Sequence, residues 1–398
     1  MVVSQFQGAR LTQAREFRQM TKLILSELIE VVSSTISKWE KGEAEPRDVH
    51  VDDLSAKLGF DRMFFYRPVR TTKGIDFWRS QSQATRSARE RARSKLAWLK
   101  EIADYVWSYY DTPRLNLPSV SLPDNFEQIG DDDIEQIAED VREYWNLGSS
   151  PIDNVVRTLE RNGIVVGRAD LLVDKLDALS EFQRNPFILL SSHKASAVRS
   201  RFDAAHELGH ILMHRHISQR ELNTAPKFSL IEEQAHRFAA AFLLPQKHFV
   251  RELWSPSLQA LRERKEEWGA SIGCMLMRSW HLGVITENQY RNLNVQISKR
   301  GWRRREPLDE ALRVERPRLL AQCLENLVAS KTKSREQILR DLRLPSKEIG
   351  ELASLRLGFF DTPDDLGIKP VDSQDSPEPR PETTILEFRL PFEADSAS

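Results

Sequence analysis

The sequence predicts a mainly helical protein with a small β-sheet, an α+β fold, preceded by an all-helical N-terminal domain. Apolar residues recur with helical spacing along most of the 398 residues, and glycine or proline closes many of these segments. Only two short apolar runs predict strands, IVVGR at residues 164–168 and PFILLSS at residues 186–192. The length exceeds one ordinary hydrophobic core, so we expect two or three domains.

The overall composition excludes several classes of protein. The net charge of −1 means that any nucleic-acid site must be local. Cys274 and Cys323 lie far apart in sequence and indicate a reducing compartment, with neither a disulfide framework nor a thiolate metal cluster. The N-terminal MVVSQFQGAR has no apolar core of signal-peptide length, and no apolar run approaches the ~20 residues that span a bilayer. We therefore expect a cytoplasmic protein without a membrane partner.

Residues 1–70 predict short helices separated by turns. Two helices are expected around Glu30–Val32, and the second should end at Gly42 with Ile36 and Trp39 facing the core. The residues left on the solvent side, which we expect to meet a DNA groove or its phosphates, are Ser33, Ser34, Thr35, Ser37 and Lys38.

A basic stretch follows at residues 73–100. It has eight Lys/Arg and two Asp/Glu residues, a local net charge of +6, and it leads into the amphipathic segment LAWLKEIADYVWSYY. Phosphate contacts are one interpretation of this charge, and a solvated helix that connects domains is the simpler one. The next segment, DTPRLNLPSVSLPDN, has three prolines and predicts a linker.

The remainder of the chain predicts helices around the two strands. Residues 133–148 and 151–163 have helical apolar spacing and end on glycine. Residues 246–360 are expected to be helical throughout. From residue 361 onward the chain has ten acidic and three basic residues with many prolines, which predicts a disordered tail.

The segment RSRFDAAHELGHILMHRH, residues 199–216, raises the question of a metal site. Residues four apart share a helix face, so His206 and His210 can bind one ion. Glu207 is displaced by about 100° around the axis and is expected to reach a water on the ion, as in H-E-x-x-H peptidases. Gly209 weakens the helix, which suggests close approach to a neighbouring strand. Unrelated histidines on an ordinary helix are the alternative, and a third ligand decides between the two.

Two places in the sequence offer a third ligand. His216 follows His210 by six residues, but Met213 stands where such a layout needs a glycine turn. The segment EEQAHRFAAAFLLP predicts another helix, whose alanines permit close helix contact. Its acidic pair, Glu232 and Glu233, is expected at the helix start, where anions are favoured. Either carboxylate would complete a His-His-Glu zinc site.

RFDAAHELGHILMH followed by EEQAHRFAAAFLLP resembles the ImmA/IrrE family of zinc metallopeptidases, which implies a zincin-like peptidase domain. The resemblance implies that His206, His210 and Glu232 bind Zn²⁺ and that Glu207 is the catalytic base. Glu233 is the alternative ligand if the register slips by one residue.

Two further histidines are candidates for supporting roles. His236 stands where the family usually has asparagine, and we expect it to orient the carboxylate of Glu232. His214 lies one turn beyond His210 on the ligand face. It is expected either to help stabilise an oxyanion or to be a solvated residue at the helix end.

The N-terminal segment resembles the XRE/Cro-type helix-turn-helix family in STISKWEKGEAEP and LSAKLGF. Three positions depart from that pattern: Glu30 replaces the usual turn glycine, Val32 replaces a Ser/Thr N-cap, and Lys22 replaces a phosphate-contacting glutamine. DNA binding is the favoured prediction, and a degenerate helical module that binds protein is the alternative.

Together the resemblances imply a zinc-dependent endopeptidase fused to a DNA-binding domain. Its substrate would be a protein, commonly a helix-turn-helix repressor whose cleavage derepresses phage, mobile-element or stress genes. The alternative is a transcriptional regulator or antitoxin-like DNA-binding protein whose peptidase fold senses metal or a partner without proteolysis. The expected domains are 1–70 helix-turn-helix, 71–130 basic connector and proline-rich linker, 131–250 metallopeptidase core, 251–360 helical extension and 361–398 acidic tail.

Overall fold

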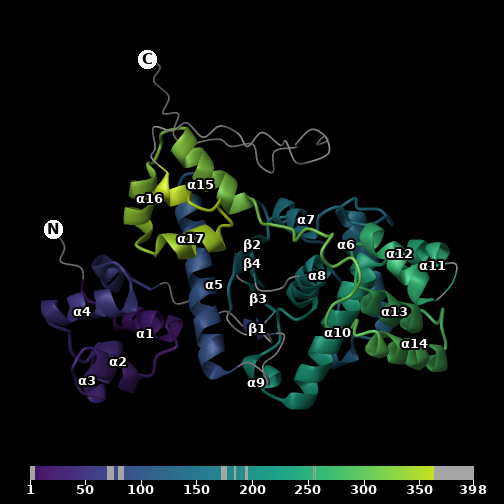
Figure 1. The fold of residues 1–398 in the computed structure, drawn as a ribbon, viewed down its shortest axis with the longest axis horizontal. Helices are drawn as coiled ribbons and strands as arrows, with labels where there is room; N and C mark the ends of the chain where they lie inside the picture. The colour runs from purple at the N-terminus through teal and green to yellow at the C-terminus, as the bar shows by residue number, and fades with distance from the viewer. Residues whose placement is uncertain are drawn as a thin grey trace.

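The protein is mainly helical with one small β-sheet, which confirms the predicted fold class (Figure 1). The computed structural model describes residues 5–69, 76–78, 85–171, 177–182, 185–192, 196–253, 255 and 257–362. Nearly all of the predicted acidic tail, residues 363–398, lies outside the described residues. In the described part of the chain, no helix is both long and apolar enough to cross a membrane.

The N-terminal unit is all-helical. Its elements are α1 (Gly8–Phe17), α2 (Lys22–Leu28), α3 (Ser33–Lys41), α4 (Asp48–Leu58) and the 3₁₀ turn η1 (Arg62–Tyr66). Helix α3 buries Ile36 and Trp39 and is followed by Gly42 with φ +72°, as the sequence predicted. Glu30, in the turn between α2 and α3, has φ +53°, a conformation that glycine adopts at lower cost.

Helix α5 (Arg86–Val106) is the long upright helix between the N-terminal helices and the strands in Figure 1. Much of this helix is buried. The interpretation of the basic stretch as a solvated connecting helix is therefore wrong for residues 86–100. Lys95 is 1% exposed and pairs with Glu348 and Glu351, whereas Lys100 pairs with Glu181. These basic side chains neutralise internal carboxylates, so their charge is not available to phosphates.

The sheet has four strands in the order β1-β3-β4-β2. The strands are β1 (Asp76–Trp78), β2 (Val165–Ala169), β3 (Ala178–Phe182) and β4 (Pro186–Ser191). Strand β2 runs parallel to β4, and the other pairs are antiparallel. Strands β2 and β4 were predicted, and β1 and β3 were not.

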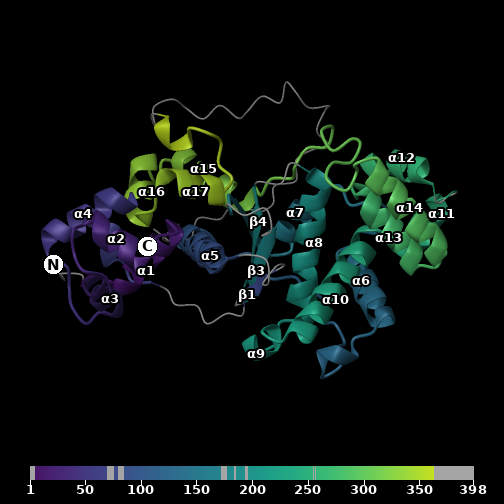
Figure 2. The same cartoon turned by 60° about the horizontal axis from the view of Figure 1, so that its bottom comes forward.

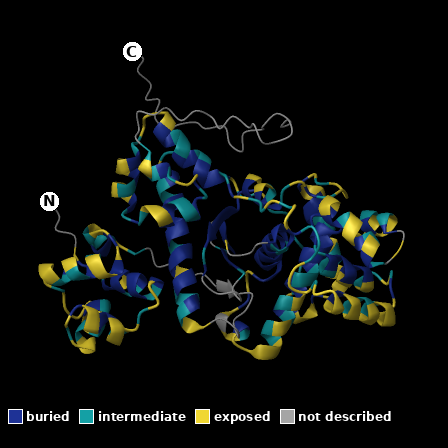
Figure 3. Cartoon of the chain, in the orientation of Figure 1, coloured by how far each residue is buried: buried dark blue, intermediate teal, exposed yellow. Residues whose placement is uncertain are grey.

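The sheet separates two hydrophobic cores. Along β2, Val165 belongs to the core on the α5 side, and Val166 belongs to the core around α8 (Ala197–Met213). Figure 2 shows α5 and α8 on opposite sides of the strands, and Figure 3 shows buried residues along both helices. A Cβ atom on Gly167 would lie 2.7 Å from the methyl groups of Leu99, so this glycine permits the close packing of α5 on β2.

The other helices divide between the two sides. On the α8 side lie helices of the second core, together with short connecting elements. They are η2 (Phe126–Gln128), α6 (Asp131–Tyr144), α7 (Val155–Arg161), α9 (Gln219–Leu222), α10 (Ala225–Leu243), α11 (Gln246–Glu252), α12 (Leu258–Trp268), α13 (Ile272–His281) and α14 (Glu287–Lys299). Residues 300–318 form no helix, so the prediction of helices throughout residues 246–360 is wrong for this segment. The chain then returns to α5. There it forms α15 (Leu319–Ala329), α16 (Arg335–Leu342), α17 (Ser346–Leu352) and the 3₁₀ turn η3 (Phe359–Asp361).

Candidate metal centre

Helices α8 and α10 pack closely enough to bring their polar residues together. A Cβ atom on Gly209 of α8 would lie 3.0 Å from the ring of Phe238 and 3.4 Å from the Cα of Ala235, both on α10. The close approach predicted for Gly209 is therefore to a helix, and the predicted approach to a strand is wrong. The small residues predicted to allow helix contact, such as Ala235 and Ala239, are fully buried.

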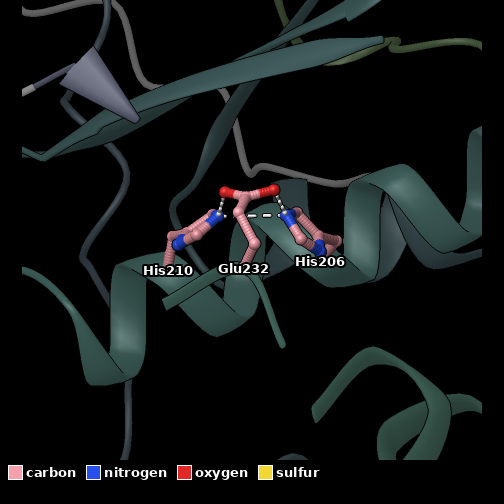
Figure 4. A group of neighbouring side chains, drawn as sticks. All are labelled: His206, His210 and Glu232. Atoms are coloured by element: carbon pink, nitrogen blue, oxygen red, sulfur yellow. Dashed lines mark hydrogen bonds and ion pairs between the residues drawn. The ribbon is translucent and has the colours of Figure 1, made fainter. Parts of the chain in front are cut away.

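Three side chains from these helices meet at one point, as Figure 4 shows. The Nε2 atoms of His206 and His210 lie 3.0 Å apart. The carboxylate of Glu232 lies against both rings: Oε2 is 3.6 Å from His206 Nε2, and Oε1 is 3.3 Å from His210 Nε2. The histidine rings are essentially inaccessible to solvent, and the carboxylate is 12% exposed.

The spacing of these donor atoms fits a tetrahedral zinc ion. Two ligands bound to one zinc at about 2.0–2.1 Å lie about 3.3 Å from each other in a tetrahedron. The three observed separations, 3.0, 3.3 and 3.6 Å, bracket that value. Two imidazoles and one carboxylate are also a donor set typical of catalytic zinc, with the fourth position open.

The charge states of the donors suit a cation as well. Burial lowers the pKa of the His206 imidazole well below its usual value, and the neighbouring His236 adds to this effect. Burial alone would raise the pKa of Glu232, but hydrogen bonds and charges from His206 and His210 outweigh it and lower that pKa. A metal ion binds the unprotonated imidazole and the ionised carboxylate, because these forms have free lone pairs.

The structure separates Glu232 from the other candidates for the third ligand. Glu233 is exposed and lines a cavity that does not include the histidine pair. His216 is also exposed and contacts Arg215. Helix α10 begins at Ala225, so the predicted placement of Glu232 at the helix start is wrong, and the helix dipole does not explain its position.

Glu207 lies on α8 between the two histidines, on the same buried part of the helix. Its side chain is fully buried, as are those of His206 and His210. This position next to both histidines suits a group that accepts and then releases a proton during catalysis.

His214 and His236 both lie close to the metal donors. His214 is fully buried, so the interpretation as a solvated helix-end residue is wrong. Burial, and then the neighbouring His210, lowers the pKa of His214 to about 3. His236 donates through Nδ1 to the backbone oxygen of Glu232 at 2.6 Å, and its ring packs 4.5 Å from that of His206. The predicted contact with Glu232 is thus made to its backbone.

No role was predicted for Gln234, which is 3% exposed on α10 and hydrogen-bonds to His214 at 3.0 Å. A signal for it exists in the sequence, because Gln234 is a polar residue on the helix face of Ile231 and Phe238. A polar side chain at such a position needs buried partners.

A cavity of about 700 Å³ lies beside the metal donors, between α8, α10 and α13. Phe202, His236, Met277 and Trp280 are among the residues that line it. The three donors do not line this cavity, but His236 does, and its ring contacts that of His206. Its volume is large enough for side chains of a bound polypeptide.

The five residues predicted to meet DNA lie on the solvent side of α3. Ser33, Ser34 and Lys38 are exposed, and Thr35 and Ser37 are half-buried. The neighbouring surface is unusually apolar for a DNA contact. Its exposed large apolar residues are Leu23 (59% exposed), Ile24 (46%), Leu28 (41%) and Val32 (66%).

Helix α8 with its H-E-x-x-H pattern, the glutamate of α10 and the adjoining sheet define a domain of metallopeptidase type. Residues 159–279 match peptidase family M78, described as the IrrE N-terminal-like domain. The matched segment runs from the end of α7 into α13 and includes His206, Glu207, His210 and Glu232. The N-terminal unit lies outside the match, so its resemblance to helix-turn-helix proteins stays a prediction. No curated protein matches the chain.

Proposed function

We propose that the chain is a zinc-dependent endopeptidase. The observation that supports this proposal most directly is the convergence of His206, His210 and Glu232 at separations of 3.0–3.6 Å, with Glu207 buried on the same helix. The match to a metallopeptidase family over the same residues supports it independently. His206, His210 and Glu232 would hold the ion.

A bound zinc ion would lower the pKa of water toward about 7 and polarise the peptide carbonyl. Glu207 acts as the general base, accepting a proton while the water oxygen forms its bond to the carbonyl carbon. Glu207 then delivers this proton to the peptide nitrogen as the C–N bond breaks. Because Glu207 is buried, few solvent molecules compete for that proton.

The proposed substrate is a protein, and we favour a helix-turn-helix repressor because of the family resemblance. Its cleavage would derepress phage, mobile-element or stress genes. The cavity of about 700 Å³ lined by His236 supports a polypeptide substrate, since it offers apolar and charged walls one ring away from the donor set.

Glu207→Gln tests the proposal. The variant and the wild type are incubated with candidate helix-turn-helix repressors, and zinc content is measured in both. We expect cleavage to fall by about 10²–10⁴-fold while zinc content is unchanged, because the base is removed and the ligands are not. Equal cleavage by both proteins contradicts the assignment of Glu207. If neither cleaves and DNA binding responds to zinc, the metal-sensing regulator is favoured.

For the N-terminal unit, DNA binding through α3 is a second proposed function, supported by exposed Ser33, Ser34 and Lys38. Lys38→Glu should weaken binding of a labelled duplex in a fluorescence-anisotropy titration and reduce its salt slope by about 1. Lys57→Glu makes the same charge change at an exposed residue of α4 and is the matched control. If the wild type binds no duplex, the exposed apolar residues near α2 favour the alternative, a module that binds protein.

A further inference from the structure

A chain of buried hydrogen bonds runs from the metal donors to a segment near residue 126. His210 Nδ1 lies 2.9 Å from His214 Nδ1, and His214 Nε2 lies 3.0 Å from Gln234 Oε1. Gln234 Nε2 donates to the backbone oxygens of Phe126 at 2.8 Å and Ile129 at 3.1 Å. The three side chains in this chain are 0–3% exposed.

The two backbone carbonyls fix the direction of every hydrogen bond in this chain. Carbonyl oxygens only accept, so the amide nitrogen of Gln234 must face Phe126 and Ile129, and its Oε1 faces His214. Because Oε1 also only accepts, the hydrogen of His214 is on Nε2. As a neutral imidazole, His214 then has a lone pair on Nδ1.

The same logic sets the tautomer of His210. With a lone pair on His214 Nδ1, the shared hydrogen belongs to His210 Nδ1, which donates. Nε2 of His210 is then the unprotonated nitrogen. This is the atom that faces His206 at 3.0 Å and Glu232 at 3.3 Å, and a metal ligand needs its lone pair there.

We propose that His214 and Gln234 are positioning residues that fix the tautomer and ring orientation of His210 for metal binding. The proposal rests on the proposed zinc site and adds two residues of this chain to it. In metal sites generally, groups that hydrogen-bond the far nitrogen of a ligand histidine affect metal affinity by about 10–100-fold.

The test measures zinc affinity of the full-length, metal-free protein by competition with a chromophoric chelator. His214→Leu removes both hydrogen bonds, and we expect zinc affinity to fall about 10–100-fold. His214→Gln keeps their direction, since an amide oxygen can accept from His210 and an amide nitrogen can donate to Gln234. It should restore most of the affinity. His216→Leu, the same change at an exposed histidine two residues away, should leave affinity unchanged.

Gln234→Met is the second variant, in case His214→Leu does not fold. It should weaken zinc binding in the same direction, because His214 then loses the acceptor that fixes its tautomer. The proposal is overturned if His214→Leu or Gln234→Met binds zinc as tightly as the wild type, or if His214→Gln binds as weakly as His214→Leu. A wild type that binds no zinc refutes instead the proposed function.

Discussion

Replacing Glu232 with glutamine tests which carboxylate completes the metal site. The wild-type carboxylate lies 3.3 Å from His210 Nε2 and 3.6 Å from His206 Nε2, whereas the adjacent Glu233 is exposed. Glutamine keeps the shape of the side chain and removes its charge. Glu233→Gln is therefore a matched control, with the same chemical change one residue away.

The expected size of the effect follows from linkage. At a free zinc concentration of one hundred times the dissociation constant, binding raises the free energy of unfolding by about 2.7 kcal/mol. Losing a residue that only hydrogen-bonds a metal ligand weakens metal binding by up to about 100-fold. If losing the Glu232 carboxylate weakens zinc binding by the same factor, the zinc-induced increase in the free energy of unfolding falls to about 0.4 kcal/mol. At about 2 °C per kcal/mol, the zinc-induced rise in Tm falls from about 5 °C to about 1 °C.

Differential scanning calorimetry with and without zinc measures this rise, and elemental analysis gives the zinc bound per chain. We expect Glu233→Gln to match the wild type in both measurements. A full zinc-induced rise in Glu232→Gln, together with its loss in Glu233→Gln, would refute the assignment of Glu232. The two carboxylates would then exchange roles, and the observed packing of α10 would be in the wrong register.

Three other predictions concern stability. Lys100→Met should lower the free energy of unfolding by about 3–5 kcal/mol in a urea titration, since it leaves Glu181 buried without its ion pair. Adding Glu181→Met should recover most of the loss, and no recovery would contradict the pairing. Burial raises the pKa of Glu160 to about 7, against the backbone hydrogen bonds that favour its charged form. Its contribution to stability is therefore full below about pH 4.5 and is lost as pH rises through about 7, by about 3 kcal/mol. The difference in unfolding free energy between the wild type and Glu160→Gln should fall over that range, and a flat difference would contradict the raised pKa. Gly209→Leu should cost about 1–3 kcal/mol by overpacking against Phe238, and unchanged calorimetric stability would contradict the tight contact.

The sequence could predict those parts of the site that depend on local geometry. His206 and His210 are four residues apart, so any helix over that segment places them on one face. The position of Glu232 depends on how α10 packs against α8, and only the family resemblance distinguished it from Glu233. The chain of hydrogen bonds through Gln234 was not predicted, because the backbone acceptors of Gln234, at Phe126 and Ile129, are more than a hundred residues away in sequence.

Two errors in the predicted fold, the solvated connector and the missed strand β3, have a common physical cause, which is the burial of charge. A basic stretch with a net charge of +6 is usually solvated, so its helix was interpreted as a connector. In α5, however, Lys95 and Lys100 are paired with carboxylates that come from α17 and β3. Glu181 likewise interrupts the apolar pattern of β3, and this strand was missed. Pairing across long sequence separations leaves no local pattern to detect.

Other buried contacts of α5 determine how far the N-terminal unit can act independently. Phe17 of α1 packs 4.7 Å from Trp98 of α5, and Arg10 pairs with Glu101 of α5 at 2.7 Å, where both side chains are at most 7% exposed. Helix α5 in turn packs on the sheet, whose opposite face contacts α8. Removing the N-terminal unit would expose Trp98 and leave the Glu101 carboxylate without its partner. Any DNA or protein that binds α3 would therefore bind a unit packed on α5, and α5 packs on the sheet that α8 contacts on its other face. Tests of either function therefore require the full-length chain.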